Sequence, residues 1–388
     1  MSNLKTILAF IITIFLSSCN NDPKNNDFSE TKIYPYTLES KSTINIPIDS
    51  ITPKETMSLV GFEDENEDYL LFLNPNNQFL VININKEKVV NTMAFDKDGP
   101  NGVGKISGFL PLSLDSIFLF PTRENKIFIT DTTSNLKSVL TYEIGEEYSN
   151  IYAISSLNSQ PAIFGDKLIS KNVMTGNWRE MGSKELGEKG LSHSVDLSTG
   201  NADLLPFKYP KDYWDDYKKD FNFSFAIGKD KVVYSFFADN NLYYSTNLKG
   251  ELNKTQGQSK YFDDSFVEWP LSGTKEERFH YYVGSQHYLS IYYDKYRDVY
   301  YRFAYPALED IDQSELVSLR RHPNRFSIII FDNNLSIIGE RFFEDKNKYV
   351  TNNCFVSREG LYISINHPEN NQISEDVLSF ELLKLESL

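Results

Sequence analysis

Cysteine and basic side chains are scarce in this 388-residue chain, and each shortage excludes a class of protein. The only cysteines are Cys19 and Cys354, so the sequence holds no disulfide framework and no CxxC pair for a metal ion. Lysine and arginine number 39 against 54 aspartates and glutamates, and the net charge of −15 argues against nucleic acid as a partner. With 40% hydrophobic residues, the chain can still bury a large core.

The N-terminal hydrophobic run is too short to cross a membrane. Residues 6–16 follow Lys5 and form an apolar stretch of roughly 11 residues, whereas a spanning helix needs about 20. The run ends in the sequence LSSC at residues 16–19, which resembles a bacterial lipobox. We therefore predict a lipoprotein signal peptide over residues 1–18, with a diacylated Cys19 as the first mature residue. An ordinary secretory signal with an incidental cysteine is the alternative.

Residues 19–40 are expected to form a lipidated, flexible tether, because the segment after Cys19 is polar and rich in turn-forming residues. At least two acyl chains would anchor the protein stably in a membrane. No aspartate follows Cys19 directly, which in similar lipoproteins favours the outer membrane. The sequence thus predicts an outer-membrane lipoprotein on the periplasmic or cell-surface face, with residues 41–388 as its folded domain.

The body of the chain has a sequence pattern that is typical of β-strands. Short β-branched and aromatic runs, such as residues 69–73 and 79–84, are separated by Asn, Asp and Gly turns, as in antiparallel hairpins. The runs recur in irregular units, and four-stranded units of about 40 to 50 residues suit propeller blades. We predict an all-β, six-bladed β-propeller, with seven blades possible and residues 43–48 completing the last blade. A β-sandwich is the alternative.

One segment carries a family resemblance. The glycine-rich residues 98–104, the sequence FLP at 109–111 and a strand ending at Asp131 resemble one NHL-type propeller repeat. Together with the lipobox and the length, they make the chain similar to the DUF4221-like family, bacterial lipoproteins of unknown function. The resemblance implies a six-bladed propeller of NHL or TolB-like type, and it supplies no catalytic residues.

Motifs for catalysis or cofactor binding are weak. Residues 99–105 have the spacing of a phosphate loop, but Ile106 stands where a magnesium-binding hydroxyl is needed. The five histidines form no HExxH motif, and we expect neither a cofactor nor a metal site. Acidic pairs such as those at 63–65 are interpreted as solvated loops. Cys354 lies in an apolar strand and is interpreted as a buried, inert thiol.

An aromatic loop is the most informative candidate site. Aromatic rings beside carboxylates suit the recognition of a sugar or a peptide, and packing between blades is the alternative. The ligand-binding candidates are Tyr213, Trp214, Asp215, Asp216 and Tyr217.

The sequence therefore favours a non-catalytic propeller that binds a glycan or an envelope protein in the cell envelope. The alternative is a propeller hydrolase or lyase with histidines and carboxylates in the central channel. That alternative requires His280, His287 or His322 to meet two carboxylates near the axis.

The lipidation of Cys19 is directly testable. Metabolic labelling with a fatty-acid analogue should mark the wild-type protein and leave Cys19→Ala unmarked, because the acyl chains are attached to the thiol. Gel fluorescence of the labelled proteins measures the difference, and equal labelling of both would contradict the lipoprotein prediction.

Overall fold

The computed structural model describes residues 34–388, except 149–150, 156–159, 215–217 and 310. The predicted signal peptide and the lipidated Cys19 lie outside the described residues. In the described part, strands dominate. The elements are β1 (Tyr36–Pro47), β2 (Leu59–Asp64), β3 (Glu67–Asn74), the 3-10 turn η1 (Pro75–Asn77), β4 (Gln78–Asn83), β5 (Lys88–Ala94), β6 (Ile106–Ser113), β7 (Ser116–Pro121), β8 (Lys126–Thr130), β9 (Leu136–Thr141), β10 (Ala162–Phe164), β11 (Lys167–Lys171), α1 (Ser183–Glu188), β12 (Ser192–Asp196), β13 (Ala202–Leu204), β14 (Phe223–Ile227), β15 (Val232–Phe236), β16 (Asn241–Ser245), β17 (Asn253–Gln256), α2 (Lys275–Gly284), β18 (His287–Asp294), β19 (Val299–Tyr305), α3 (Leu316–Arg321), β20 (Arg325–Asp332), β21 (Ile337–Glu344), β22 (Val350–Val356), β23 (Leu361–Ser364) and β24 (Val377–Ser387).

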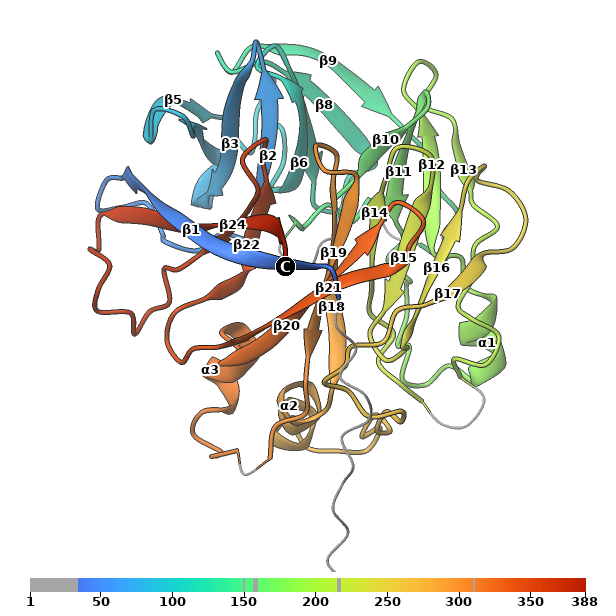
Figure 1. Ribbon diagram of the computed structural model, residues 1–388. Coiled ribbons are helices and arrows are strands. Elements are labelled where there is room, and N and C mark those ends of the chain that lie inside the picture. The colour runs from blue at the N-terminus through green and yellow to red at the C-terminus, as the bar shows by residue number, and fades with distance from the viewer. Residues whose placement is uncertain (1–33, 149–150, 156–159, 215–217, 310) are drawn as a thin grey trace, which may run out of the picture. The chain divides into compact units, whose positions relative to one another are not determined.

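The sheets are arranged like the blades of a propeller (Figure 1). Within the described residues, β2–β5, β6–β9, β10–β13 and β14–β17 each form a four-stranded antiparallel sheet. The first strands of the sheets contact one another: β2 touches β6 and β22, β14 touches β10 and β18, and β18 touches β22. This confirms the all-β propeller prediction, and the β-sandwich alternative is wrong because the sheets are not stacked as two layers.

The remaining strands form one eight-stranded sheet, in the order β18-β19-β20-β21-β1-β24-β23-β22. A single parallel pair, Tyr36 with Gly339, joins its two four-stranded runs. Counted by separate sheets the described chain has five units, and divided at this pair it has six. The number of blades therefore depends on whether the eight-stranded sheet is divided at that pair.

The first strand completes the last sheet. β1 pairs antiparallel with β24 from Tyr36 opposite Ser387 to Pro47 opposite Val377. The predicted role of residues 43–48 is thus confirmed, since most of that segment lies in β1. The strand begins at Tyr36, so residues 36–40 belong to the sheet, although the sequence assigned them to the tether.

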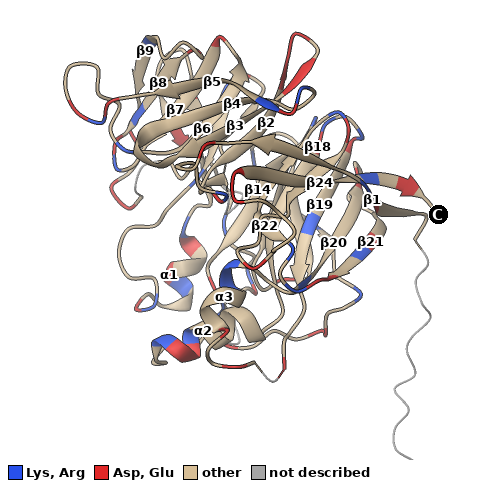
Figure 2. Ribbon diagram, turned by 90° about the vertical axis from the view of Figure 1, so that its left-hand side faces the viewer, with Lys and Arg blue, Asp and Glu red and all other residues tan. Residues whose placement is uncertain are grey.

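Burial follows the position of a strand in its sheet. The second and third strands, such as β7 and β15, are buried along almost their whole length, because both of their faces pack against neighbouring sheets. The outermost strands β5 and β9 are mostly exposed. Figure 2 shows charged residues concentrated in the turns and on the helices. The apolar core accordingly lies between the sheets.

The short helices lie in the longer connections. The helix α2 begins with a capping box, in which Thr274 and Glu277 satisfy each other's backbone N–H groups. It packs against α3, which lies in the polar segment after β19. None of the helices in the described ranges combines the length and the hydropathy that a membrane-spanning helix needs.

The pairing of β1 with β24 should contribute strongly to stability. Ile46 is fully buried among Leu70, Leu80 and Phe380, so Ile46→Ala should lower the free energy of unfolding by about 2–5 kcal/mol. Glu39→Ala, at an exposed position of the same strand, should change it by less than about 0.5 kcal/mol. Urea denaturation measures both values, and an unchanged midpoint for Ile46→Ala would contradict the closure.

Candidate functional site

A central channel of about 520 Å³ lies where the first strands of the sheets meet. Its wall contains residues of β2, β6, β10, β14, β18 and β22. Each of these strands is the terminal strand of its sheet order, so in the described structure each has a strand neighbour on one side only. Backbone N–H and C=O groups on such edges need water or another partner. The channel therefore offers a row of backbone hydrogen-bonding groups.

Close contacts hold the wall together. A Cβ atom on Gly61 in β2 would lie 2.8 Å from the carbonyl oxygen of Val356 in β22. A Cβ atom on Gly108 in β6 would lie 1.8 Å from the carbonyl oxygen of Ala153, in the connection between β9 and β10. Only glycine permits these approaches. The two glycines thus keep neighbouring segments close enough to enclose the channel.

The side chains that line the channel are mainly apolar and aromatic. They include Leu110, Ile227, Ile291, Tyr292 and Tyr293. Burial raises the pKa of Tyr292 well above its usual range, so its hydroxyl stays protonated. The wall consequently combines apolar contact surface with neutral hydrogen-bonding groups.

Charged side chains gather at one end of the channel. Glu63 at the end of β2 lies 3.8 Å from the Lys295 ammonium and 3.9 Å from the Arg358 guanidinium. The hydroxyl of Tyr296 donates to Glu63 over 3.0 Å. Arg358 also donates from Nε to the buried Asp68 over 3.0 Å. Glu63 is thus held in a charged network at the channel mouth and does not simply belong to a solvated loop.

Burial and a neighbouring charge shift the pKa of Asp68 in opposite directions. Burial raises the pKa of this carboxyl group, and the neighbouring Arg358 acts in the opposite direction. Because Arg358 contacts both Glu63 and Asp68, it links the mouth to the buried start of β3.

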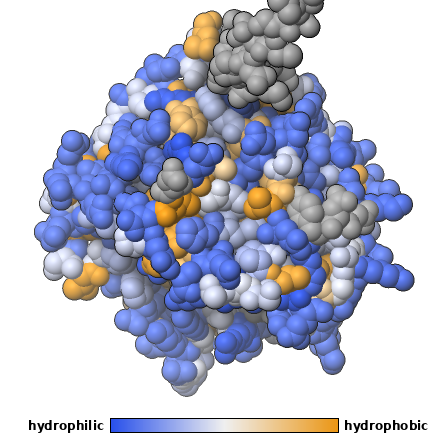
Figure 3. All heavy atoms as spheres, turned by 90° about the horizontal axis from the view of Figure 1, so that it is seen from below, coloured by the Kyte–Doolittle hydropathy of each residue, from blue (hydrophilic) through white to orange (hydrophobic). Residues whose placement is uncertain are grey.

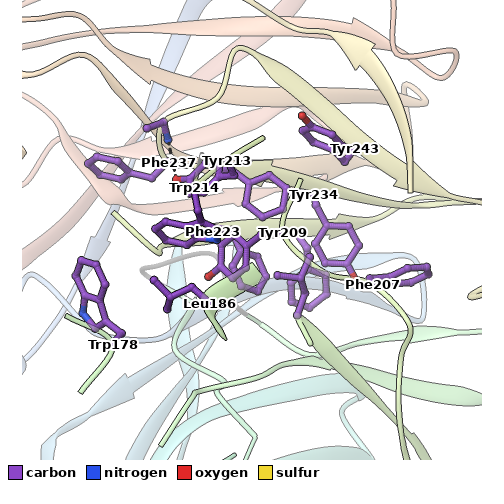
Figure 4. Packing of buried hydrophobic residues seen from close by; sticks show 14 of the residues in the cluster. Trp178, Leu186, Phe207, Tyr209, Tyr213, Trp214, Phe223, Tyr234, Phe237 and Tyr243 are labelled. Atoms are coloured by element: carbon purple, nitrogen blue, oxygen red, sulfur yellow. Dashed lines mark hydrogen bonds between the residues drawn. The ribbon is translucent and has the colours of Figure 1, made fainter. Parts of the chain in front are cut away.

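The aromatic loop lies elsewhere and is buried. Tyr213 and Trp214 are 1% and 2% exposed, and their ring centroids lie 4.8 Å apart (Figure 4). The Tyr213 hydroxyl donates to the backbone oxygen of Asp220 over 2.6 Å. Tyr213 and Trp214 therefore present no ring face to a ligand, and the packing alternative holds for both, because they pack into the core with Leu186, Phe223 and Phe236. Asp215, Asp216 and Tyr217 lie outside the described residues.

The histidines do not form the arrangement that the enzyme alternative requires. His280 is exposed, and His287 is buried, with its ring stacked 4.6 Å from Phe237 and 5.0 Å from Tyr305. His322 lies 2.7 Å from one carboxylate, Glu55. In the contacts of the described chain, none of these three imidazoles meets two carboxylates.

No group of three or more His, Cys, Asp or Glu side chains in the described ranges is placed to hold a metal ion.

Cys354 is buried, as predicted, and burial raises the pKa of its thiol well above the usual range. It also lines the channel, as do Tyr292 and Tyr293. Neither tyrosine is among the ligand-binding candidates predicted from the sequence. Their position in the first strand of a four-stranded unit is the signal that could have placed them at the axis.

Similarity to known proteins supplies the family. A family model described as Domain of unknown function (DUF4221) matches residues 35–341. The chain belongs to the DUF4221 family. The resemblance inferred from the sequence is thereby confirmed. No protein with a curated description matches this DUF4221 chain.

Solved structures support the fold. A DUF4221 family member from Bacteroides vulgatus is similar at a TM-score of 0.79 and 24% identity, over 92% of this chain and 99% of the other. A protein from Bacteroides fragilis, described as a candidate for export, is similar at a TM-score of 0.54 and 12% identity, over 92% and 98%. At such identities the likeness shows the propeller fold of this DUF4221 protein and nothing about its ligand.

The buried histidines should make this protein sensitive to acid. Burial lowers the pKa of His287 to about 4, whereas the unfolded chain takes up the proton near 6.5. The unfolded state therefore binds more protons between these pH values, and stability falls as the pH is lowered from 6.5 to 4, by about 3 kcal/mol for this group. His193, whose pKa burial also lowers to about 4, acts in the same direction.

Urea denaturation at several pH values tests this dependence. His287→Phe keeps a flat ring between Phe237 and Tyr305 and should flatten the curve between pH 6.5 and 4. The exposed His280→Gln should retain the wild-type slope. A His287→Phe curve parallel to that of the wild type would contradict the assignment.

Proposed function

We propose that this DUF4221 protein is an exported, lipid-anchored propeller that binds a small ligand in its central channel without catalysing a reaction. The observation that carries the proposal is the channel of about 520 Å³, enclosed by the edge strands of the sheets. Its volume lies in the range of about 300–1,000 Å³ that is typical of small-molecule sites.

The chemistry of the wall indicates the class of ligand. Apolar and aromatic side chains favour a flat apolar face in the ligand, and the backbone groups on the strand edges favour a rim of hydrogen-bonding groups. Glu63 and Lys295 add one charge of each sign to the lining. A sugar unit of an envelope glycan has both a flat apolar face and a rim of hydrogen-bonding groups.

The location rests on two supports. The lipobox-like sequence at residues 16–19 supports a lipid anchor on Cys19, and the similar Bacteroides fragilis protein is described as a candidate for export. We infer an outer-membrane lipoprotein that works in the cell envelope. A hydrolase or lyase has less support. Such a site needs a histidine that meets two carboxylates, and in the described structure His322 contacts one, that of Glu55.

Blocking the channel tests the proposal. Leu112 lines the channel and is 44% exposed, so Leu112→Trp should narrow the space while leaving the core intact. With 1-anilinonaphthalene-8-sulfonate as the fluorescent probe, we expect one saturable site in the wild type and at least tenfold weaker binding in Leu112→Trp. Ala162→Trp, from β10, should weaken the binding in the same way.

Val139→Trp is the matched control for Leu112→Trp. Val139 is 46% exposed and lies in β9, the outermost strand of the sheet that contains Leu112. Its affinity for the probe should equal that of the wild type. Equal probe binding in both channel variants and the wild type, with unchanged melting temperatures, would refute channel binding.

A further inference from the structure

A second cavity, which we call the arginine pocket, is lined by Arg320, Arg321 and Arg325. It lies where α2 and α3 meet the ends of inner strands, and its other walls include His287 of β18, Tyr305 of β19 and Asn352 of β22. Its volume is about 30 Å³, more than the roughly 10–15 Å³ that one water molecule needs. The pocket is thus suited to a compact polar group.

Arg320 is held with its hydrogen-bonding edge available. Its guanidinium lies 5.0 Å from the ring centroid of Phe279 and 4.9 Å from that of Tyr282, both in α2. Stacking uses the face of a guanidinium and leaves its N–H groups at the edge. In the described structure, the side chains of Arg320 and Arg321 donate to no protein group. Both therefore keep donors for a ligand.

Arg325 presents a donor that needs a partner. One of its Nη atoms donates to the backbone oxygen of Ala307 over 3.1 Å. Its Nε atom is buried and, among the described residues, has no acceptor. A buried N–H without a partner costs free energy, so an acceptor in the pocket would be favourable.

The charge around the pocket is unusual for this protein. The chain has a net charge of −15, yet the lining contains three arginines and no aspartate or glutamate. Within the described chain, none of the three arginines has a carboxylate oxygen within 4.0 Å. Figure 3 views the face with α2 and α3, which is hydrophilic with scattered small apolar patches. The pocket is a locally basic site on an acidic molecule.

We propose that the arginine pocket binds the oxyanion group of a small acidic ligand, namely a carboxylate, phosphate or sulfate. Guanidinium edges match the spacing of two oxyanion oxygens and bind them through paired charged hydrogen bonds. The size of the pocket admits this group, with the rest of the ligand outside. The site is separate from the channel and does not depend on the function proposed for it.

A structural role explains only part of the arrangement. Arg320 and Arg321 lie in the last turn of α3, where positive charge stabilises the end of a helix. Arg325 lies in β20, outside the helix, and its buried Nε atom gains nothing from α3. A role at the helix end therefore leaves the third arginine unexplained.

Thermal unfolding of the full chain tests the proposal. Sodium phosphate, sulfate and acetate are titrated separately, with sodium chloride holding the ionic strength constant so that general screening does not change. At least one oxyanion should raise the melting temperature with a saturable dependence on concentration. The anion that saturates at the lowest concentration identifies the chemical class, and glucuronate against acetate then tests for an acidic sugar.

Variants assign the effect to the pocket. The double variant Arg320→Gln and Arg321→Gln changes exposed side chains and should weaken oxyanion binding at least tenfold, and so should Arg325→Gln alone. Lys249→Gln, which removes one positive charge from an exposed turn, should bind as the wild type does. Absence of a saturable shift with all three anions, or an unchanged shift in the arginine variants, would overturn the proposal.

Discussion

The pairing of β1 with β24 is the interaction on which the rest of the structure depends. It places the first described strand beside the last one, so the two ends of the chain share one sheet. Each sheet must bury both of its faces against neighbours, and that condition is met for all sheets only when the ring is closed. Closure explains why β1 contributes Leu38 to one core cluster and Ile46 to another.

Contacts between sheets extend this constraint. Arg302 in β19 is fully buried, donates from Nε to Ser235 over 2.8 Å and lies over the ring of Tyr288 at 3.3 Å. A buried guanidinium is stable only when its donors are satisfied, and its other bonds go to four backbone oxygens, those of Asp239, Asn240, Asn241 and Gly257. Arg302 therefore fixes β19 to the neighbouring sheet. With sheets fixed in this way, the inner edges cannot collapse, and a channel remains at the axis.

The features that local patterns encode were predictable from the sequence. Apolar runs and turn residues predicted the hairpin β3–β4, and residues 43–48 were expected to complete the last blade, where β1 pairs with β24. For Trp214 the sequence left packing and ligand binding both open, because two carboxylates follow it and core partners such as Leu186 and Phe236 are distant along the chain. The arginine pocket was missed for the same reason. Its walls come from segments that only the ring brings together.

The direction of the inner strands gives the two ends of the channel different chemistry. β18 begins at His287 and β22 at Val350, and His287 and Thr351 line the arginine pocket. Both strands end toward the mouth, where Lys295 and Arg358 follow in short turns. Long connections, including those with α2 and α3, lie at the first end, where insertions leave the sheets undisturbed. The short turns at the mouth fix their charges closely to the strands. Variation among similar propellers should therefore arise at the helical end, while the charged mouth is constrained by the fold itself.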